Sequence, residues 1–321
     1  MREFGGKIAV VTGGGSGMGR ELCLQLAQEG CHVALCDVSP ESLEQTQALC
    51  SAAAPGGTRI TTFEADVSDE SQVVAFRDAV VDAHGTDHIH LLFNNAGIGA
   101  GGSFVVDGRD EWEKTFEVCW NGVYYCSRAF VPLLVASSEG HLVNTSSVNG
   151  FWASLGPQSS HSAYSSAKFA VKGFTEALVN DFRLNAPHVG VSLVMPGHIG
   201  TSIVINSGRI LGRDPKDLPD EELVAIRDRM TRMGLEIEGT TNDEIRNALQ
   251  ARAESFRDDA PMTAAEAATV ILDGVREERW RILVGQDAET LDRLVRENPE
   301  EAYEASFMER LMAEADWALG T

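Results

Sequence analysis

Length, composition and charge describe an ordinary globular chain with an acidic surface. The 321 residues are 43% hydrophobic and 23% charged, and their formal net charge of −22 repels phosphate backbones and anionic lipid headgroups. Nucleic acid and membrane surfaces are therefore poor candidate partners; no apolar run approaches the roughly 20 residues of a membrane span, and the first residues lack a signal-peptide pattern, so we expect a cytoplasmic protein.

Strand-like and helix-like patterns alternate along the first two thirds of the chain. Short runs of β-branched and apolar residues predict strands at 7–13, 32–37, 58–66, 88–97, 140–147, 190–197 and 281–285. Helical patterns separate them, and Ser39 and Ser68 are typical helix caps. This alternation predicts an α/β fold, a doubly wound parallel sheet of about seven strands with helices on both faces. No linker or repeat interrupts it, so we expect a single domain over residues 1–321.

Six cysteines lie at positions 23, 31, 36, 50, 119 and 126. They form no C-x-x-C pair and no Cys/His cluster with the spacing of zinc ligands. We therefore expect reduced structural thiols and no metal site.

A glycine-rich stretch, "VTGGGSGMGR", joins the first predicted strand to its helix. The spacing G-x-G-x-x-G is not met, because Met18 stands where the third glycine would be. Gly13, Gly17 and Gly19 give G-x-x-x-G-x-G instead. Glycines at such a turn let the backbone approach a pyrophosphate at the helix N-terminus. The stretch predicts a dinucleotide site, with a glycine-rich turn that binds no ligand as the alternative.

Asp37 ends the second predicted strand, 20 residues after Gly17. An acidic side chain at this distance can accept hydrogen bonds from the hydroxyls of an adenosine ribose, and it would repel a 2′-phosphate. No Arg or Lys follows in "CDVSPES". The position favours NAD over NADP, although Asp37 could also serve as a cap for the next helix.

Four motifs occur in a fixed order: "TGGGSGMG", "NNAG" at 94–97, "NTSS" at 144–147 and "YSSAK" at 164–168. Together they resemble the short-chain dehydrogenase/reductase family over about residues 5–201. The resemblance implies a Rossmann-like fold and an NAD(H)-dependent enzyme that interconverts a secondary alcohol and a ketone. It also implies a homodimer or homotetramer through the fourth and fifth helices.

The resemblance assigns roles residue by residue. The implied catalytic residues are Tyr164, Lys168, Ser147 (the second serine of its pair) and Asn121, which would bend the helix predicted at 110–137 and hold a proton-relay water. The implied cofactor residues are Gly13, Ser16, Gly17, Met18, Gly19, Asp37, Val38, Asp66, Val67, Asn94, Ala96, Gly97, Tyr164, Lys168, Pro196, Gly197, Ile199 and Thr201. The implied substrate residues are Asn149, Phe151, Trp152 and His198.

Tyr164 and Lys168 lie four residues apart in a helical pattern, so they share one helix face. Hydride transfer from an alcohol also requires a proton acceptor, and lowering a tyrosine pKa from about 10 to about 7 requires about 4 kcal/mol. One ammonium about 4 Å away supplies about that much at an effective dielectric constant of 20. We expect Lys168 to make Tyr164 a general base, while Ser147 binds the substrate oxygen. His161 is interpreted as a polar loop residue.

Residues 202–260 extend the common pattern, and 286–321 form a helical C-terminal extension. An apolar stripe predicts a helix within 220–237: Leu223, Ile226, Met230, Met233 and Ile237. The opposite face carries Asp228, Arg229, Arg232 and Glu236. Thr241 and Glu244 fit a capping box for a second helix. We expect a substrate lid whose stripe, with Phe151 and Trp152, favours a bulky apolar substrate; alternatively, the stripe packs on the domain's own core or on another subunit.

Two other functions compete with an NAD-dependent dehydrogenase. An NADPH-preferring carbonyl reductase is disfavoured by Asp37. A non-catalytic NAD-binding regulator is disfavoured because the chain keeps both Tyr164 and Lys168.

Overall fold

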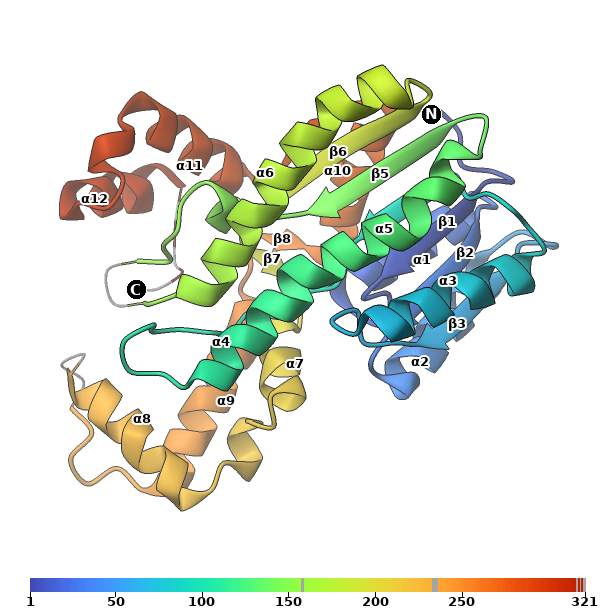
Figure 1. Cartoon of the computed structure of the whole chain (residues 1–321). Helices are drawn as coiled ribbons and strands as arrows, with labels where there is room; N and C mark the ends of the chain where they lie inside the picture. The colour runs from blue at the N-terminus through green and yellow to red at the C-terminus, as the bar shows by residue number, and fades with distance from the viewer. Residues whose placement is uncertain (157–158, 233–235, 316, 318, 320–321) are drawn as a thin grey trace.

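The computed structural model describes residues 1–156, 159–232, 236–315, 317 and 319 (Figure 1). Parallel strands form one sheet in the order β3-β2-β1-β4-β5-β6-β9. Their bounds are β1 Ile8–Thr12, β2 His32–Asp37, β3 Ile60–Glu64, β4 Leu91–Asn94, β5 Gly140–Thr145, β6 Val189–Pro196 and β9 Arg281–Val284. The strand order reverses between β1 and β4, where open α/β sheets bind their ligands. The doubly wound parallel sheet is confirmed.

Helices cover both faces of this sheet (Figure 1). One face carries α1 (Gly17–Gln28), α2 (Pro40–Ala53) and α10 (Ala264–Arg276), and the other carries α3 (Glu70–His84), α5 (Gly122–Val135) and α6 (Ser162–Asn185). Alternate residues of β1 serve the two faces, since Ala9 and Val11 belong to the first core, and Ile8 and Val10 to the second. The central strands are buried on both sides, as their continuous apolar runs predict.

The two predicted caps have different outcomes. Ser39 begins α2 as expected, because its hydroxyl accepts the backbone N–H of Ser42. Ser68 is wrong as the cap of α3. Asp69 caps that helix with its carboxylate, and the Ser68 hydroxyl donates to Asp66 instead. A carboxylate one residue later satisfies two helix N–H groups rather than one.

The insertion after β6 is a helical unit tied at both ends by a small parallel sheet. Strand β7 (Ile199–Gly200) pairs with β8 (Met262–Thr263), and α7 (Ile203–Ile210), α8 (Asp220–Arg232) and α9 (Asn242–Asp258) lie between them. The predicted capping box at Thr241 is present. The two-residue strands were not expected, because they are too short for a periodic signal.

The apolar stripe of α8 packs inside this unit, so its assignment as a substrate wall is wrong. Leu223 is fully buried with Leu218 and Ile245, and Ile226 and Met230 pack against the same cluster. The alternative, packing on the protein itself, holds because α9 offers the nearest apolar face. Met233 and the side chains of Arg229 and Arg232 lie outside the described residues, and α8 ends before Ile237.

The C-terminal extension consists of α11 (Gln286–Glu297) and α12 (Ala305–Ala315). Both pack against the segment that follows β5, and they lie beside the upper part of the sheet in Figure 1. Trp152 is the centre of this contact: it is 1% exposed, packs on Phe307, and donates its indole N–H to the carbonyl of Ala302 at 2.7 Å. Within the described residues, no helix has both the length and the apolar character needed to cross a membrane.

Candidate active site

The candidate site lies where the carboxyl ends of β1, β2, β4, β5 and β6 converge. The glycine-rich loop follows β1, Asp37 ends β2, and Gly97 follows β4. Ser147 follows β5, and residues 196–201 follow β6. Because parallel strands end at the same sheet edge, one cleft collects residues that are more than 100 positions apart in sequence.

The glycine-rich loop requires its three glycines for different reasons. Gly13 and Gly17 have φ values of +65° and +52°, which side chains rarely tolerate. A Cβ on Gly19 would collide with the carbonyl of Gly13. The loop leads into the N-terminus of α1, whose first turn carries no acidic residue. Its backbone N–H groups can therefore hold an anionic pyrophosphate.

Asp37 lies against this loop. Its carboxylate accepts the backbone N–H of Gly15 at 3.0 Å and that of Ser39 at 3.1 Å. Burial raises the pKa of Asp37, and these hydrogen bonds act against that rise. The cap of α2 is Ser39, so the alternative of a capping role for Asp37 does not hold. Arg20 is the nearby cation, and its guanidinium is bound to the carbonyl of Gly15 at 2.6 Å.

Helix α7 crosses from the glycine-rich loop to the end of β4. Asn206 donates to the hydroxyl of Ser16 at 3.1 Å, and the hydroxyl of Ser207 accepts the backbone N–H of Gly99 at 2.8 Å. A Cβ on Gly17 would lie 3.2 Å from Thr201, which begins this crossing. The predicted cofactor residues Ser16, Gly17 and Thr201 are therefore brought together by the first helix of the insertion.

Two predicted cofactor residues use their side chains elsewhere. Asn94 is 2% exposed and donates to Ser127 and Asn144, so its side chain joins β4 to β5 and α5 instead of lining the cleft. Asp66 binds the ammonium of Lys114 at 2.8 Å. Burial raises the pKa of Asp66, but the hydrogen bonds from Lys114 and from the neighbouring serine outweigh burial and hold it below its usual value.

The two adjacent serines have different partners. Ser146 donates its hydroxyl to the carbonyl of Lys168 at 2.8 Å, so it fixes α6 against β5. Ser147 lies at the start of the short helix Val148–Gly150, and its hydroxyl accepts the N–H of Asn149. A hydrogen bond from Ser147 also favours the phenolate of Tyr164. The geometry thus favours Ser147 over Ser146 as the substrate-binding serine.

Tyr164 and Lys168 share one face of α6, as their spacing predicts. The ammonium nitrogen of Lys168 lies 5.3 Å from the centre of the Tyr164 ring and donates to the carbonyl of Thr145 at 2.8 Å. Burial raises the pKa of Tyr164 and lowers the pKa of Lys168, because both lose solvation of their charged forms. The expected effect of Lys168 on Tyr164, aided by the positive ring of the cofactor, stays a prediction.

Three further features complete this part of the site. Asn121 ends a π-helical turn, Glu117–Asn121, between α4 (Arg109–Phe116) and α5, and such turns are a known cause of helix bends. His161, taken from sequence as a polar loop residue, packs its ring 4.7 Å from that of Tyr164. Burial lowers the pKa of His161 to about 4, so the imidazole is neutral near pH 7.

All four predicted substrate residues make contacts within the protein. Trp152 is buried in the C-terminal extension, and its assignment as a substrate residue is wrong. Asn149 donates its side-chain amide N–H groups to the carbonyls of Trp152 and Ser154. The ring of His198 packs at a tilt against that of Phe256 in α9 and contacts that residue's carbonyl at 2.7 Å. Sequence patterns indicate that such side chains are buried or polar. They do not indicate which residues these side chains contact.

Phe151 packs toward the same extension as its neighbour. Its ring joins the cluster around α11, with the guanidinium of Arg281 5.8 Å from the ring centre. The loop expected to line the substrate pocket is thus turned toward the C-terminal helices. The part of this loop at 157–158 lies outside the described residues.

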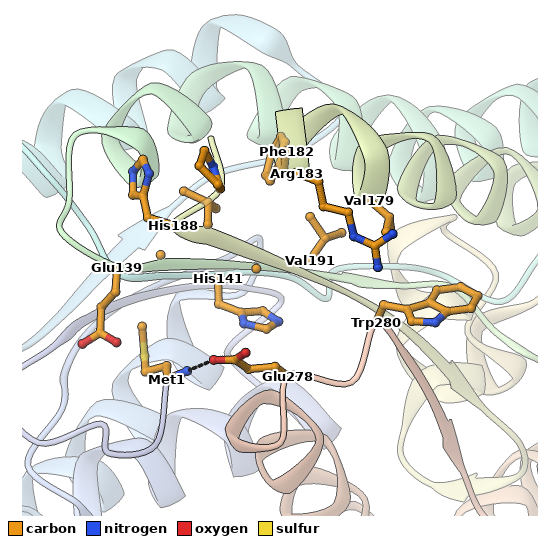
Figure 2. A pocket seen from close by; sticks show the side chains of 14 residues that line it. Met1, Glu139, His141, Val179, Phe182, Arg183, His188, Val191, Glu278 and Trp280 are labelled. Atoms are coloured by element: carbon orange, nitrogen blue, oxygen red, sulfur yellow. Dashed lines mark hydrogen bonds and ion pairs between the residues drawn. The ribbon is translucent and has the colours of Figure 1, made fainter. Parts of the chain in front are cut away.

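A cavity of about 370 Å³ lies at the other end of the sheet (Figure 2). It opens at the amino ends of β5 and β6, around His141 and Val191, with Phe182, Glu278 and Trp280 on its walls. The catalytic candidates follow the carboxyl ends of the same strands. This cavity is therefore separate from the candidate site.

The cysteines are free and buried, as predicted. Burial raises the pKa of Cys31 and of Cys126 to about 12, so both remain thiols. Within the part of the chain that the structure describes, no group of three or more His, Cys, Asp or Glu side chains could hold a metal ion.

Comparison with known proteins agrees with this geometry. A family model described as short chain dehydrogenase matches residues 7–209. The chain belongs to the short-chain dehydrogenase family. It is 34% identical over 297 residues, 92% of each chain, to the putative oxidoreductase SadH of Mycobacterium tuberculosis. The fold and the family together show an oxidoreductase.

Two solved structures of this family contain nicotinamide cofactors. A short-chain dehydrogenase/reductase from Burkholderia phymatum, in complex with NAD, has a TM-score of 0.74 and 32% identity, over 94% of this chain and 96% of that one. A metagenomic short-chain oxidoreductase, in complex with NADP, has a TM-score of 0.54 and 31% identity, over 60% of this chain and 83% of that one. Members of the family thus bind NAD or NADP.

The two serines provide a matched test of the assignment. We expect Ser147→Ala to lower kcat at least about a hundredfold, because the substrate oxygen loses a hydrogen bond that strengthens as charge develops. Ser146→Ala should instead lower the free energy of unfolding by about 1 kcal/mol, the usual value of one internal hydrogen bond, with kcat largely kept. Steady-state kinetics and urea denaturation of both variants measure the two effects. The reverse pattern would assign Ser146 to the chemistry.

Proposed function

We propose that this oxidoreductase uses NAD(H) to interconvert a secondary alcohol and a ketone, with Tyr164 as general acid and base. The observation that carries the proposal is the cluster of Tyr164, Lys168 and Ser147 beside the glycine-rich loop, at the switch point of the sheet. The cluster combines a proton carrier packed on an apolar core with a buried cation and a buried hydroxyl. A non-catalytic regulator would not require that combination.

The residues of the chain divide the proton chemistry among them. Ser147 would hydrogen-bond the substrate oxygen, and the Tyr164 hydroxyl would give a proton to that oxygen or take one from it. Lys168, held by the carbonyl of Thr145, would bind the ribose hydroxyls and favour the phenolate. When bound, NAD⁺ would accept the hydride, and its positively charged ring would add to the effect of Lys168 on Tyr164. Asn121 would position a water for proton exchange.

The preference for NAD over NADP rests on Asp37. Its carboxylate lies beside Gly15, where the ribose of a dinucleotide on this loop would reach it. A 2′-phosphate would meet this negative charge. The nearby cation, Arg20, is engaged by the Gly15 carbonyl and by Thr46. This arrangement disfavours the alternative of an NADPH-preferring carbonyl reductase.

The preference for a bulky apolar substrate rests on a surface that differs from the one suggested by the sequence. Phe104, Val105 and Val106, in the loop between β4 and α4, are 79%, 89% and 64% exposed. This loop reaches the catalytic helix: the carbonyl of Gly101 accepts the backbone N–H of Ala163, the residue before the catalytic tyrosine. An exposed apolar tip so close to the site suits an apolar portion of a substrate.

Assembly, lid motion and location stay predictions. Exposed rings on α5 and α6, those of Tyr124 and Phe169, fit the expected homodimer or homotetramer, and molar mass in solution would decide it. Within residues 202–260, helix α7 contacts both the glycine-rich loop and the segment after β4, and a lid over the site would lie in such a place. The cytoplasmic location rests on sequence alone.

The general base is tested by Tyr164→Phe. This change removes the proton carrier and keeps the ring, so kcat should fall at least about a hundredfold, the range usual for such groups. The dissociation constant for NADH should change little. Tyr124→Phe, a matched loss of an exposed hydroxyl on α5, should leave both values unchanged. Activity of Tyr164→Phe above a tenth of wild type would refute the assignment.

The cofactor preference is tested by comparing kcat/KM for NAD and NADP. We expect a large preference for NAD in the wild type, because Asp37 accepts ribose hydroxyls and repels a 2′-phosphate. Asp37→Ala should shrink the ratio through a higher KM for NAD and a lower KM for NADP. Glu41→Ala, at an acid in the first turn of α2, is the control. A wild type that prefers NADP would contradict the proposal.

The substrate surface is tested with secondary alcohols of increasing chain length. The wild-type kcat/KM should rise with apolar size, and Phe104→Ser should flatten this rise because apolar contact area is lost. Leu184→Ser alters an equally exposed apolar residue at the far end of α6, so it should leave the profile unchanged. A wild type with the highest kcat/KM for small polar alcohols would disprove the apolar preference.

A further inference from the structure

Asp287 is a buried carboxylate that contacts the segment after β6, residues 196–201. It lies beyond residues 7–209, which the family model covers. It lies in the first turn of α11, in the C-terminal extension, and is 5% exposed. One carboxylate oxygen accepts the backbone N–H of His198 at 2.6 Å. The other oxygen has no hydrogen-bond partner among the described residues. Sequence analysis gave Asp287 no role.

Two glycines leave the space that this carboxylate fills. A Cβ on Gly197 would collide with both oxygens of Asp287, and a Cβ on Gly285 would collide with one of them. Gly197 also donates its N–H to the carbonyl of Val284 at 2.9 Å, so the end of β6 stays beside the end of β9. The backbone of residues 196–198 therefore lies directly on the carboxylate.

No Lys or Arg of the described residues forms an ion pair with Asp287, although the imidazole of His198 is close enough to act on its charge. Burial raises the pKa of Asp287, while backbone N–H groups, that of His198 first among them, act against the rise. Asp292 on the same helix differs, because it forms ion pairs with Arg281 and Arg296. A buried carboxylate that lacks an ionic partner costs stability, so packing alone does not account for Asp287.

The rest of the segment is fixed independently. Strand β7 (Ile199–Gly200) pairs with β8, and Thr201 lies beside Gly17 of the glycine-rich loop. His198 lies in the chain between the end of β6 and these two fixed points, and its backbone N–H is held there by Asp287. Without this contact, the hydrogen bond from Gly197 to Val284 and the contact of the His198 imidazole with Phe256 would remain, but the backbone N–H of His198 would lose its acceptor.

We propose that Asp287 is a positioning residue, which sets the backbone of Pro196–Thr201 so that this segment can hold the nicotinamide end of the cofactor. The inference rests on the proposed function, since it assigns a support to the same site. Active sites lose large factors when a binding group moves by about 1 Å, so one hydrogen bond to the segment can control cofactor affinity. The C-terminal extension is then part of the cofactor site.

Three full-length variants test this role: Asp287→Ala, Asp287→Asn and the control Asp292→Asn. Asp287→Ala removes the acceptor and should raise the dissociation constant for NADH, measured by fluorescence titration, at least about tenfold. The KM for NAD should rise in parallel, with a smaller change in kcat. Asp287→Asn keeps an acceptor oxygen and the shape, so it should restore affinity to near the wild-type value.

Thermal unfolding separates positioning from general stability. Because burial raises the pKa of Asp287 in the folded state, its ionised form costs stability above that pKa. Asp287→Asn should therefore leave Tm unchanged or raise it. Asp292→Asn loses ion pairs and should lower Tm without weakening NADH binding.

The outcomes distinguish the inference from the proposed function. Wild-type affinity for NADH in Asp287→Ala would overturn the positioning role and leave the proposed function intact. Weaker binding in Asp292→Asn equal to that in Asp287→Ala would show a general effect of α11, and would also overturn it. A wild type that binds neither NADH nor NADPH would refute the proposed function and this inference together.

Discussion

Burial of the Tyr164–Lys168 pair is the constraint on which the site depends. Loss of solvent raises the pKa of the phenol and lowers the pKa of the ammonium, because burial disfavours the charged form of each group. The protonated phenol is the form that can give a proton to a ketone oxygen. Alcohol oxidation requires the phenolate, which positive charge near the ring favours. The same burial strengthens any charge that enters the cleft, because the local dielectric constant is low.

Two additions to the common fold meet at the segment that follows β6. The insertion holds it through the pairing of β7 with β8, and the C-terminal extension holds it through Asp287. Part of the insertion and all of the extension lie outside residues 7–209, which the family model covers. Elements outside the matched span therefore contact the backbone of 196–201, while the glycine-rich loop and the Tyr164 cluster lie inside it.

Local sequence signals predict the strands and most helix starts, apart from the cap at Ser68, whereas they do not predict long-range contacts. The strands, the glycine-rich loop and the capping box at Thr241 depend on neighbouring residues, so their patterns suffice. The apolar character of Trp152 and of the stripe at Leu223 was expected to face the substrate, but both pack within the protein, because periodicity does not name the partner surface. Asp287 carries no local signal, since one acid in a polar stretch resembles a surface residue. Its partner, His198, lies 89 positions away.

The costs of buried polar groups concentrate around the cleft. Among the described residues, five side-chain atoms are buried without a hydrogen-bond partner, and four of these belong to Asn94, Asn95, Ser165 and Asp287. Asn94 is the last residue of β4 and Asn95 follows it. Ser165 follows the proposed catalytic tyrosine, and Asp287 contacts the segment after β6. Each such atom costs about 1–3 kcal/mol. Most other buried polar side chains of the described residues have hydrogen-bond partners, so the fold can tolerate these costs in stability. Their position at one edge of the sheet is expected, because functional sites commonly contain groups that lower stability.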